Sequence, residues 1–156
     1  MDVEFKDGIS IYWGKNKDFT PASIHTPSWF ISINPNGWDD SDDNGNADLN
    51  ECFEACNQDA IFCKVENVSF ENVKKLLHQT ALDNLDECKE NDYGFAFCVW
   101  ETKKDYLIVA GFDNGGCEMS MEIIPQILKP FITESFTEAH FNPKNINKAT
   151  KKSFGI

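Results

Sequence analysis

Two apolar runs separated by five polar residues are the feature that most limits how this chain can fold. The first run is Gly94–Trp100 and the second is Tyr106–Phe112, and both are rich in aromatic and β-branched side chains. Residues of this kind favour strands, and the connection Glu101–Asp105 is short enough for a hairpin. We therefore expect the two runs to form a hairpin at the centre of a sheet.

Further strands are predicted on both sides of this hairpin. Val3–Phe5 and Ile9–Trp13 alternate apolar and polar residues around the turn dipeptide Asp7-Gly8, which indicates an N-terminal hairpin. Trp29–Ile33 and Ala60–Val65 are short apolar runs that we expect to be single strands.

Helical spacing is clearest in Glu71–Asn84, where Ser69 can cap the helix and the apolar residues share one face. Pro125 and Pro130 make Glu118–Phe136 ambiguous, and we expect a strand followed by a broken helix there. Short helices are expected after Asp48 and after Asn142-Pro143. The sequence thus predicts one α+β domain over residues 1–156, with a mainly antiparallel sheet and helices packed on it.

The composition of the chain limits the classes of partner that it can bind. The 156 residues carry 14 basic side chains, all of them lysine, against 26 acidic ones, a formal net charge of −12. Without arginine or a dense positive surface, nucleic acid is not expected as a partner. No secretion signal or membrane-spanning run is recognisable, so we expect a cytoplasmic protein that does not bind membranes.

Six cysteines are expected to be free thiols in a reducing compartment. A zinc site is conceivable with the ligands Cys52, Cys56, Cys63 and His78. These residues lack the short paired spacing of zinc sites, so we expect the cysteines to be buried thiols instead.

The negative charge is concentrated in one segment. Residues 39–54 contain seven carboxylates and no lysine. Carboxylates confined in this way repel one another, and a cation, a basic partner or hydration must relieve the repulsion. These three possibilities lead to different functions.

The cation alternative rests on residues 40–51, whose spacing resembles an EF-hand calcium loop. Gly45 stands where that loop turns sharply, and oxygen ligands for calcium are expected from Asp40, Asp42, Asn44, Asn46, Asp48 and Glu51. No cofactor is required on this interpretation, but Ca²⁺ is a candidate ligand.

The partner alternative rests on the small size, the charge of −12, and a predicted sheet beside the acidic segment. In these respects the chain resembles the immunity proteins that neutralise bacterial polymorphic or contact-dependent toxins, many of which are nucleases with basic active sites. The resemblance implies an inhibitor that occludes the active site of a basic toxin. The expected contact residues are Trp38, Asp39, Asp40, Asp42, Asp43, Asp48, Glu51 and Glu54.

An enzyme is the third alternative and is not favoured. His25, His78 and His140 have no serine, cysteine or acid at a motif spacing, although His140 could act as a general acid or base. A small enzyme would need a site assembled from distant residues that spacing does not reveal.

Overall fold

The computed structural model describes residues 2–6, 9–13, 27–33, 58–91, 93, 95–113, 119–141, 148 and 151–152. Its strands are β1 (Asp2–Lys6), β2 (Ile9–Trp13), β3 (Trp29–Ile33), β4 (Gln58–Val65), β5 (Phe95–Glu101), β6 (Leu107–Phe112) and β7 (Ile132–Phe141). Its two numbered helices are α2 (Phe70–Asn91) and α3 (Met119–Ile127). This is the predicted α+β architecture.

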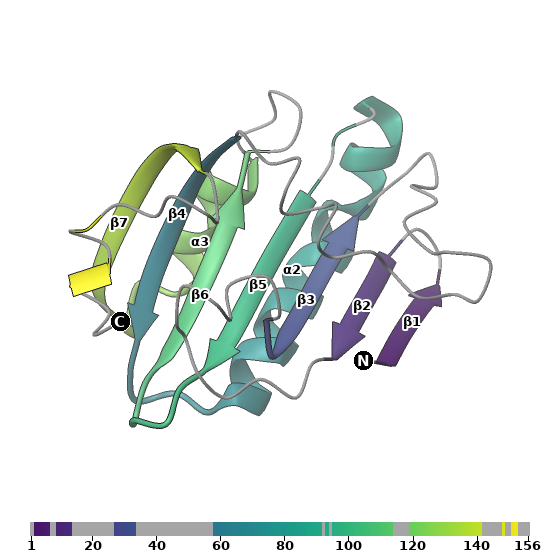
Figure 1. Cartoon of the computed structure of the whole chain (residues 1–156). Helices are drawn as coiled ribbons and strands as arrows, with labels where there is room; N and C mark the ends of the chain where they lie inside the picture. The colour runs from purple at the N-terminus through teal and green to yellow at the C-terminus, as the bar shows by residue number, and fades with distance from the viewer. Residues whose placement is uncertain are drawn as a thin grey trace.

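The seven strands form one sheet in the order β1-β2-β3-β5-β6-β4-β7, and every pairing is antiparallel. Figure 1 shows β1 at one edge and β7 at the other. The predicted central hairpin is confirmed, because β5 and β6 pair with each other in the middle of the sheet. The N-terminal hairpin is confirmed by the pairing of β1 with β2.

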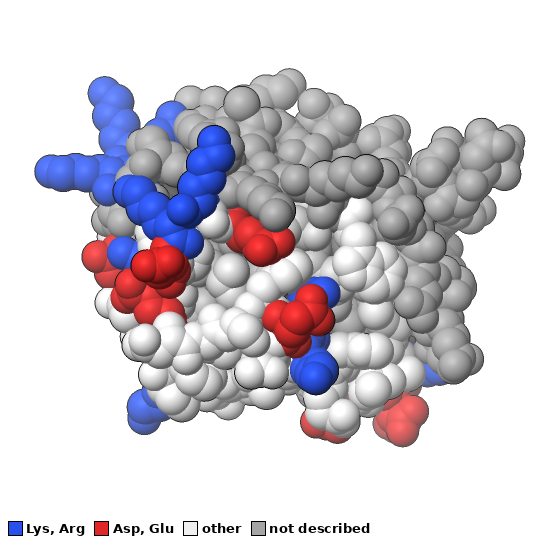
Figure 2. Space-filling view, turned by 90° about the horizontal axis from the view of Figure 1, so that it is seen from below, with Lys and Arg blue, Asp and Glu red and all other residues white. Residues whose placement is uncertain are grey.

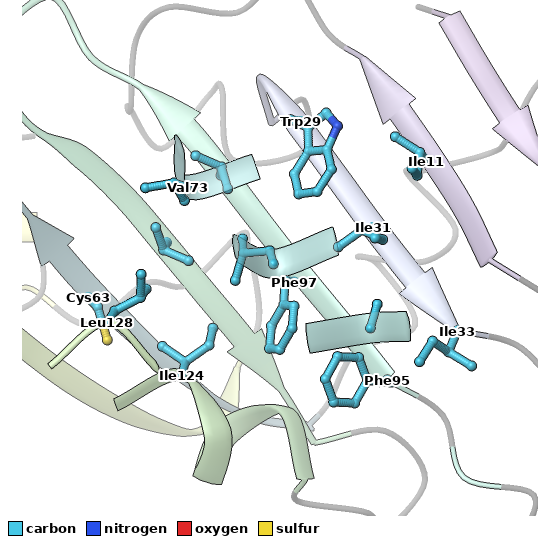
Figure 3. Close-up of a cluster of buried hydrophobic side chains, with 14 of the residues drawn as sticks. Ile11, Trp29, Ile31, Ile33, Cys63, Val73, Phe95, Phe97, Ile124 and Leu128 are labelled. Carbon is cyan, nitrogen blue, oxygen red and sulfur yellow. The ribbon is translucent and has the colours of Figure 1, made fainter. Parts of the chain in front are cut away.

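Both helices lie on the same face of the sheet, behind it in Figure 1. A core of buried apolar side chains fills the space between, drawn from the strands, from α2 and from α3. Figure 3 shows how these side chains point toward one another, with Val73 of α2 and Ile124 of α3 facing Phe97 of β5 and Cys63 of β4. Burial of this apolar area is the main force that holds the helices on the sheet.

The position of α3 depends on a glycine. A Cβ atom added to Gly111 of β6 would lie 2.7 Å from the backbone oxygen of Ser120 and 2.9 Å from Cδ1 of Ile124. The absence of a side chain therefore lets α3 approach the strand closely. The hydroxyl of Ser120 accepts a hydrogen bond from the backbone N–H of Ala96 at 3.0 Å and ties the start of α3 to β5.

The opposite face of the sheet carries a second buried cluster that is rich in aromatic rings. The ring of Phe62 on β4 lies 5.2 Å from that of Phe141 on β7, 6.2 Å from that of Trp100 on β5 and 6.3 Å from that of Phe112 on β6, measured between centroids. Adjacent strands are thus joined by ring contacts as well as by backbone hydrogen bonds.

Two predicted elements differ from the structure. The segment Glu118–Phe136 was predicted as a strand followed by a broken helix, and the order is the reverse: α3 comes first and β7 follows. Pro125 is accommodated inside α3, and its neighbour Ile124 and the residue just after the helix, Leu128, are fully buried. The lost N–H group of the proline is outweighed by this packing.

Helix α2 is longer than predicted and ends at Asn91 instead of Asn84. The apolar stripe continues through Leu85, which is half-buried, and Cys88, which is fully buried. Ser69 caps the helix as expected, because its Oγ accepts a hydrogen bond from the N–H of Asn72 at 3.1 Å. The helix expected after Asp48 lies outside the described residues, whereas Lys148, Lys151 and Lys152 near the C-terminus are helical.

Candidate functional site: the acidic end of the sheet

The predicted contact residues and calcium ligands all lie in residues 38–54, outside the described part of the chain. The structure does describe the strands on either side. Strand β3 ends at Ile33 and β4 begins at Gln58. Because β3, β5, β6 and β4 are successive antiparallel neighbours, the end of β3 and the start of β4 lie at the same end of the sheet. Three strand spacings, about 14 Å, separate them.

Described carboxylates gather at this same end, which also contains the C-terminal half of α2 and the start of α3 (Figure 1). Two lysines, Lys6 and Lys89, stand there against eight acidic residues, a net charge of −6. These acidic residues are Asp59, Asp83, Asp86, Glu87, Glu90, Asp113, Glu122 and Glu138. We call this region the acidic end of the sheet.

The opposite end has mixed charge. It carries six lysines, Lys64, Lys74, Lys75, Lys103, Lys104 and Lys129, against six acidic residues, Asp2, Glu66, Glu71, Glu101, Asp105 and Glu134, a net charge of zero. Figure 2 shows this end from below, with blue and red side chains next to one another. The ammonium group of Lys64 lies 4.5 Å from the ring centroid of Tyr106. Burial, with the nearby charges of Glu134 and Glu66, raises the pKa of Tyr106.

A β-bulge shapes the acidic end. The pairing of β4 with β7 shifts register between Gln58 and Ala60, so that Asp59 has no partner in the regular ladder. The Asp59 carboxylate accepts a hydrogen bond from the backbone N–H of His140 at 3.0 Å, and its carbonyl oxygen accepts one from the N–H of Asp113 at 2.8 Å. His140 has a φ of 50°, a conformation uncommon for residues other than glycine. These contacts fix Asp59 at the rim of the sheet.

The last turns of α2 supply four exposed carboxylates, Asp83, Asp86, Glu87 and Glu90. The predicted helix stopped at Asn84, so it included Asp83 but not Asp86, Glu87 and Glu90. The signal that could have extended it is Cys88, which lies three residues after Leu85 and continues the apolar stripe. The helix ends where the N–H of Tyr93 donates to the carbonyl oxygen of Cys88 at 3.0 Å.

The described cysteines are packing residues. Cys63, Cys88 and Cys98 are buried, and burial raises the pKa of Cys63 from 9.0 to about 12. A neutral, inaccessible thiol is a poor nucleophile and a poor metal ligand. His78 is exposed on α2, whereas Cys63 is fully buried on β4, so this structure does not bring these two candidate zinc ligands together at a metal centre. Cys52 and Cys56 lie outside the described residues.

Candidate catalytic residues are not brought together in the described part of the chain. His78 and His140 are both exposed and lie on different elements, while His25 is outside the description. Among the described residues, no group of three or more histidine, cysteine or acidic side chains is arranged to hold a metal ion. What the acidic end can do chemically is attract and hydrogen-bond cationic groups.

The calcium prediction stays a prediction, since all of its ligands lie outside the described residues. It is tested by titrating the protein with Ca²⁺ in a calorimeter. Binding heat that disappears in the Glu51→Gln variant would support the loop, because Glu51 is expected to supply two ligand oxygens. The absence of heat in both proteins would contradict it.

Comparison with known proteins gives no relative from which a function could be transferred. No family model, no curated protein and no solved structure matches this chain. Within the residues that the structure describes, none of the helices has the length and apolar character needed to cross a membrane.

Proposed function

We propose that this chain is an acidic, cytoplasmic binding protein that inhibits a basic bacterial toxin domain, such as a nuclease, by occluding its active site. The observation that carries the proposal is the uneven distribution of charge over the fold. The described residues at one end of the sheet have a net charge of −6, and the strands that flank the acidic segment 39–54 meet that same end.

This arrangement suits a partner that normally binds nucleic acid. The active sites of nucleases present lysine, arginine and histidine to phosphate groups, and carboxylates can take the place of those phosphates. A negative electrostatic field at one end of the protein orients a positively charged partner before contact and raises the association rate. Trp38 is the expected apolar anchor, because buried aromatic residues dominate the energetics of many interfaces.

The proposal is tested by co-expression. The gene immediately upstream is expressed in a bacterial host with and without this protein. We expect growth arrest in its absence and growth in its presence, and we expect the purified, catalytically inactivated product of that gene to bind the protein in a calorimeter. An upstream product that is harmless, or growth arrest that persists despite production of the protein, would contradict the proposal.

A further inference from the structure

The outer face of α2 is not covered by another described element. Val73, Leu77, Ala81 and Cys88 point into the core, and the residues between them face solvent. Leu82 lies near the middle of the outward face, since it is separated from the buried residues by about half a turn. In the described part of the chain, the large apolar side chains that are exposed are Leu82, at 47%, and Tyr93, at 38%.

Leu82 and Tyr93 stand at the two ends of an acidic stretch. Asp83, Asp86, Glu87 and Glu90 lie between them in the sequence, together with Lys89, and all five are exposed. Tyr93 is held in place just beyond the helix by the hydrogen bond from its N–H to Cys88. The outer surface of the second half of α2 thus presents two apolar side chains with four carboxylates and one lysine between them.

Folding accounts for one of these carboxylates, because Asp83 accepts a hydrogen bond from Nε2 of Gln79 at 2.8 Å, one turn earlier on the helix. It does not account for Asp86, Glu87 and Glu90, which lie in the last turns of the helix, where the partial charge of the backbone is already negative and acidic residues destabilise the helix. Asp83 and Glu87, like Asp86 and Glu90, are four residues apart, a spacing at which like charges repel. The ion pair that α2 does contain is at its other end, where Lys74 lies 2.7 Å from Glu71.

We propose that the outer face of the second half of α2 is a docking surface for the basic toxin partner, with Leu82 and Tyr93 as its apolar anchors. The inference rests on the proposed function and adds a second contact surface to the acidic segment 39–54. The complementary surface on the partner carries lysine or arginine side chains around an apolar depression. Apolar anchors among charges of one sign give both affinity and orientation.

The test uses the full-length protein and the inactivated product of the upstream gene. One variant combines Leu82→Ala with Tyr93→Ala, and another combines Asp86→Asn with Glu90→Gln. The matched control combines Glu66→Gln with Glu71→Gln, which removes two negative charges at the opposite end of the sheet. We expect each of the two paired variants to raise the Kd at least about tenfold and the control to change it less than about twofold.

A thermal readout separates docking from a structural role. The Asp86→Asn/Glu90→Gln variant should melt at a higher temperature than the wild type while it binds more weakly, because it removes repulsion at the helix end. Loss of binding accompanied by a lower Tm would overturn the inference.

The remaining outcomes separate the two proposals. Suppose that both paired variants keep the affinity of the wild type, and that the wild type binds the upstream product and protects the host. This result would overturn the inference and leave the proposed function intact. If the wild-type protein neither binds the product of the upstream gene nor protects the host, both the inference and the proposed function are wrong. If sedimentation shows a dimer that Leu82→Ala converts to a monomer, the occupant of this face is a second copy of the chain, and the inference is wrong.

Discussion

Gly111 is the residue at which the packing of α3 on the sheet is most sensitive to one added carbon atom. A Cβ there would meet the backbone of Ser120 at 2.7 Å, and a backbone oxygen cannot rotate away as a flexible side chain can. Gly→Ala normally stabilises a strand residue, by reducing the entropy of the unfolded chain. At Gly111 the close contact makes the same substitution destabilising.

We therefore expect Gly111→Ala to lower the free energy of unfolding by about 1–3 kcal/mol, the usual cost of overpacking. Urea denaturation of the wild type and the variant measures it. An unchanged or higher free energy of unfolding would contradict the contact between α3 and β6.

Cys63 gives the stability a dependence on alkaline pH. Burial raises the pKa of its thiol from 9.0 to about 12, so above pH 9 the unfolded chain releases a proton that the folded protein retains. The contribution of this protonated thiol to the free energy of unfolding is fully present below pH 9 and is lost progressively between pH 9 and about 12.

The measurement is urea denaturation at pH 8 and pH 10 for the wild type and for Cys63→Ala. We expect the free-energy difference between the two proteins to shrink by about 1.4 kcal/mol per pH unit above pH 9. A difference that is the same at both pH values would show that this thiol titrates normally in the folded state.

At the scale of single elements, α2 shows what local sequence can and cannot predict. Its cap at Ser69 and its apolar stripe from Val73 to Leu85 were readable, because both depend on residues three or four positions apart. Its end was not predicted, because the residues from Asp86 to Asn91 are polar or charged except Cys88, and that single residue, buried in the core, is the one sequence signal that the helix continues.

The cap can be tested directly. We expect Ser69→Ala to lower the free energy of unfolding by about 1 kcal/mol, since the N–H of Asn72 loses its hydrogen-bond partner. Chemical denaturation gives the value, with Ser135→Ala on the exposed part of β7 as the control. Equal effects of the two substitutions would mean that the cap contributes nothing specific.

The order of α3 and β7 was mispredicted for a reason that also lies at this scale. Pro125 is normally placed at the start of a helix or outside it, and it occupies the interior of α3. Its cost is offset by contacts of Ile124 and Leu128 with the sheet, which are distant in sequence. Short-range patterns therefore gave the wrong order although both a helix and a strand were expected.

At the scale of the whole molecule, the strand order could not be predicted from local patterns. The hairpins β1-β2 and β5-β6 follow from adjacent runs, but β4 and β7 lie side by side only because of long connections. This order brings Asp59, Asp113 and the end of α2 to one end of the sheet. The sequence predicted an acidic segment. The topology showed that described carboxylates of other elements lie at the end of the sheet where β3 ends and β4 begins.

The central claim is that this concentration of negative charge serves to capture a basic partner. Association with the inactivated product of the upstream gene is followed by stopped flow over a range of salt concentrations. The variant reverses the charge at Asp39, Asp40, Asp42 and Asp43, and the control reverses Glu66, Glu71 and Glu101 at the opposite end.

We expect the wild type and the control to associate rapidly, with rates that fall steeply as salt increases, and the variant to associate at least about tenfold more slowly with little dependence on salt. Equal rates and equal salt dependence in all three proteins would contradict the account.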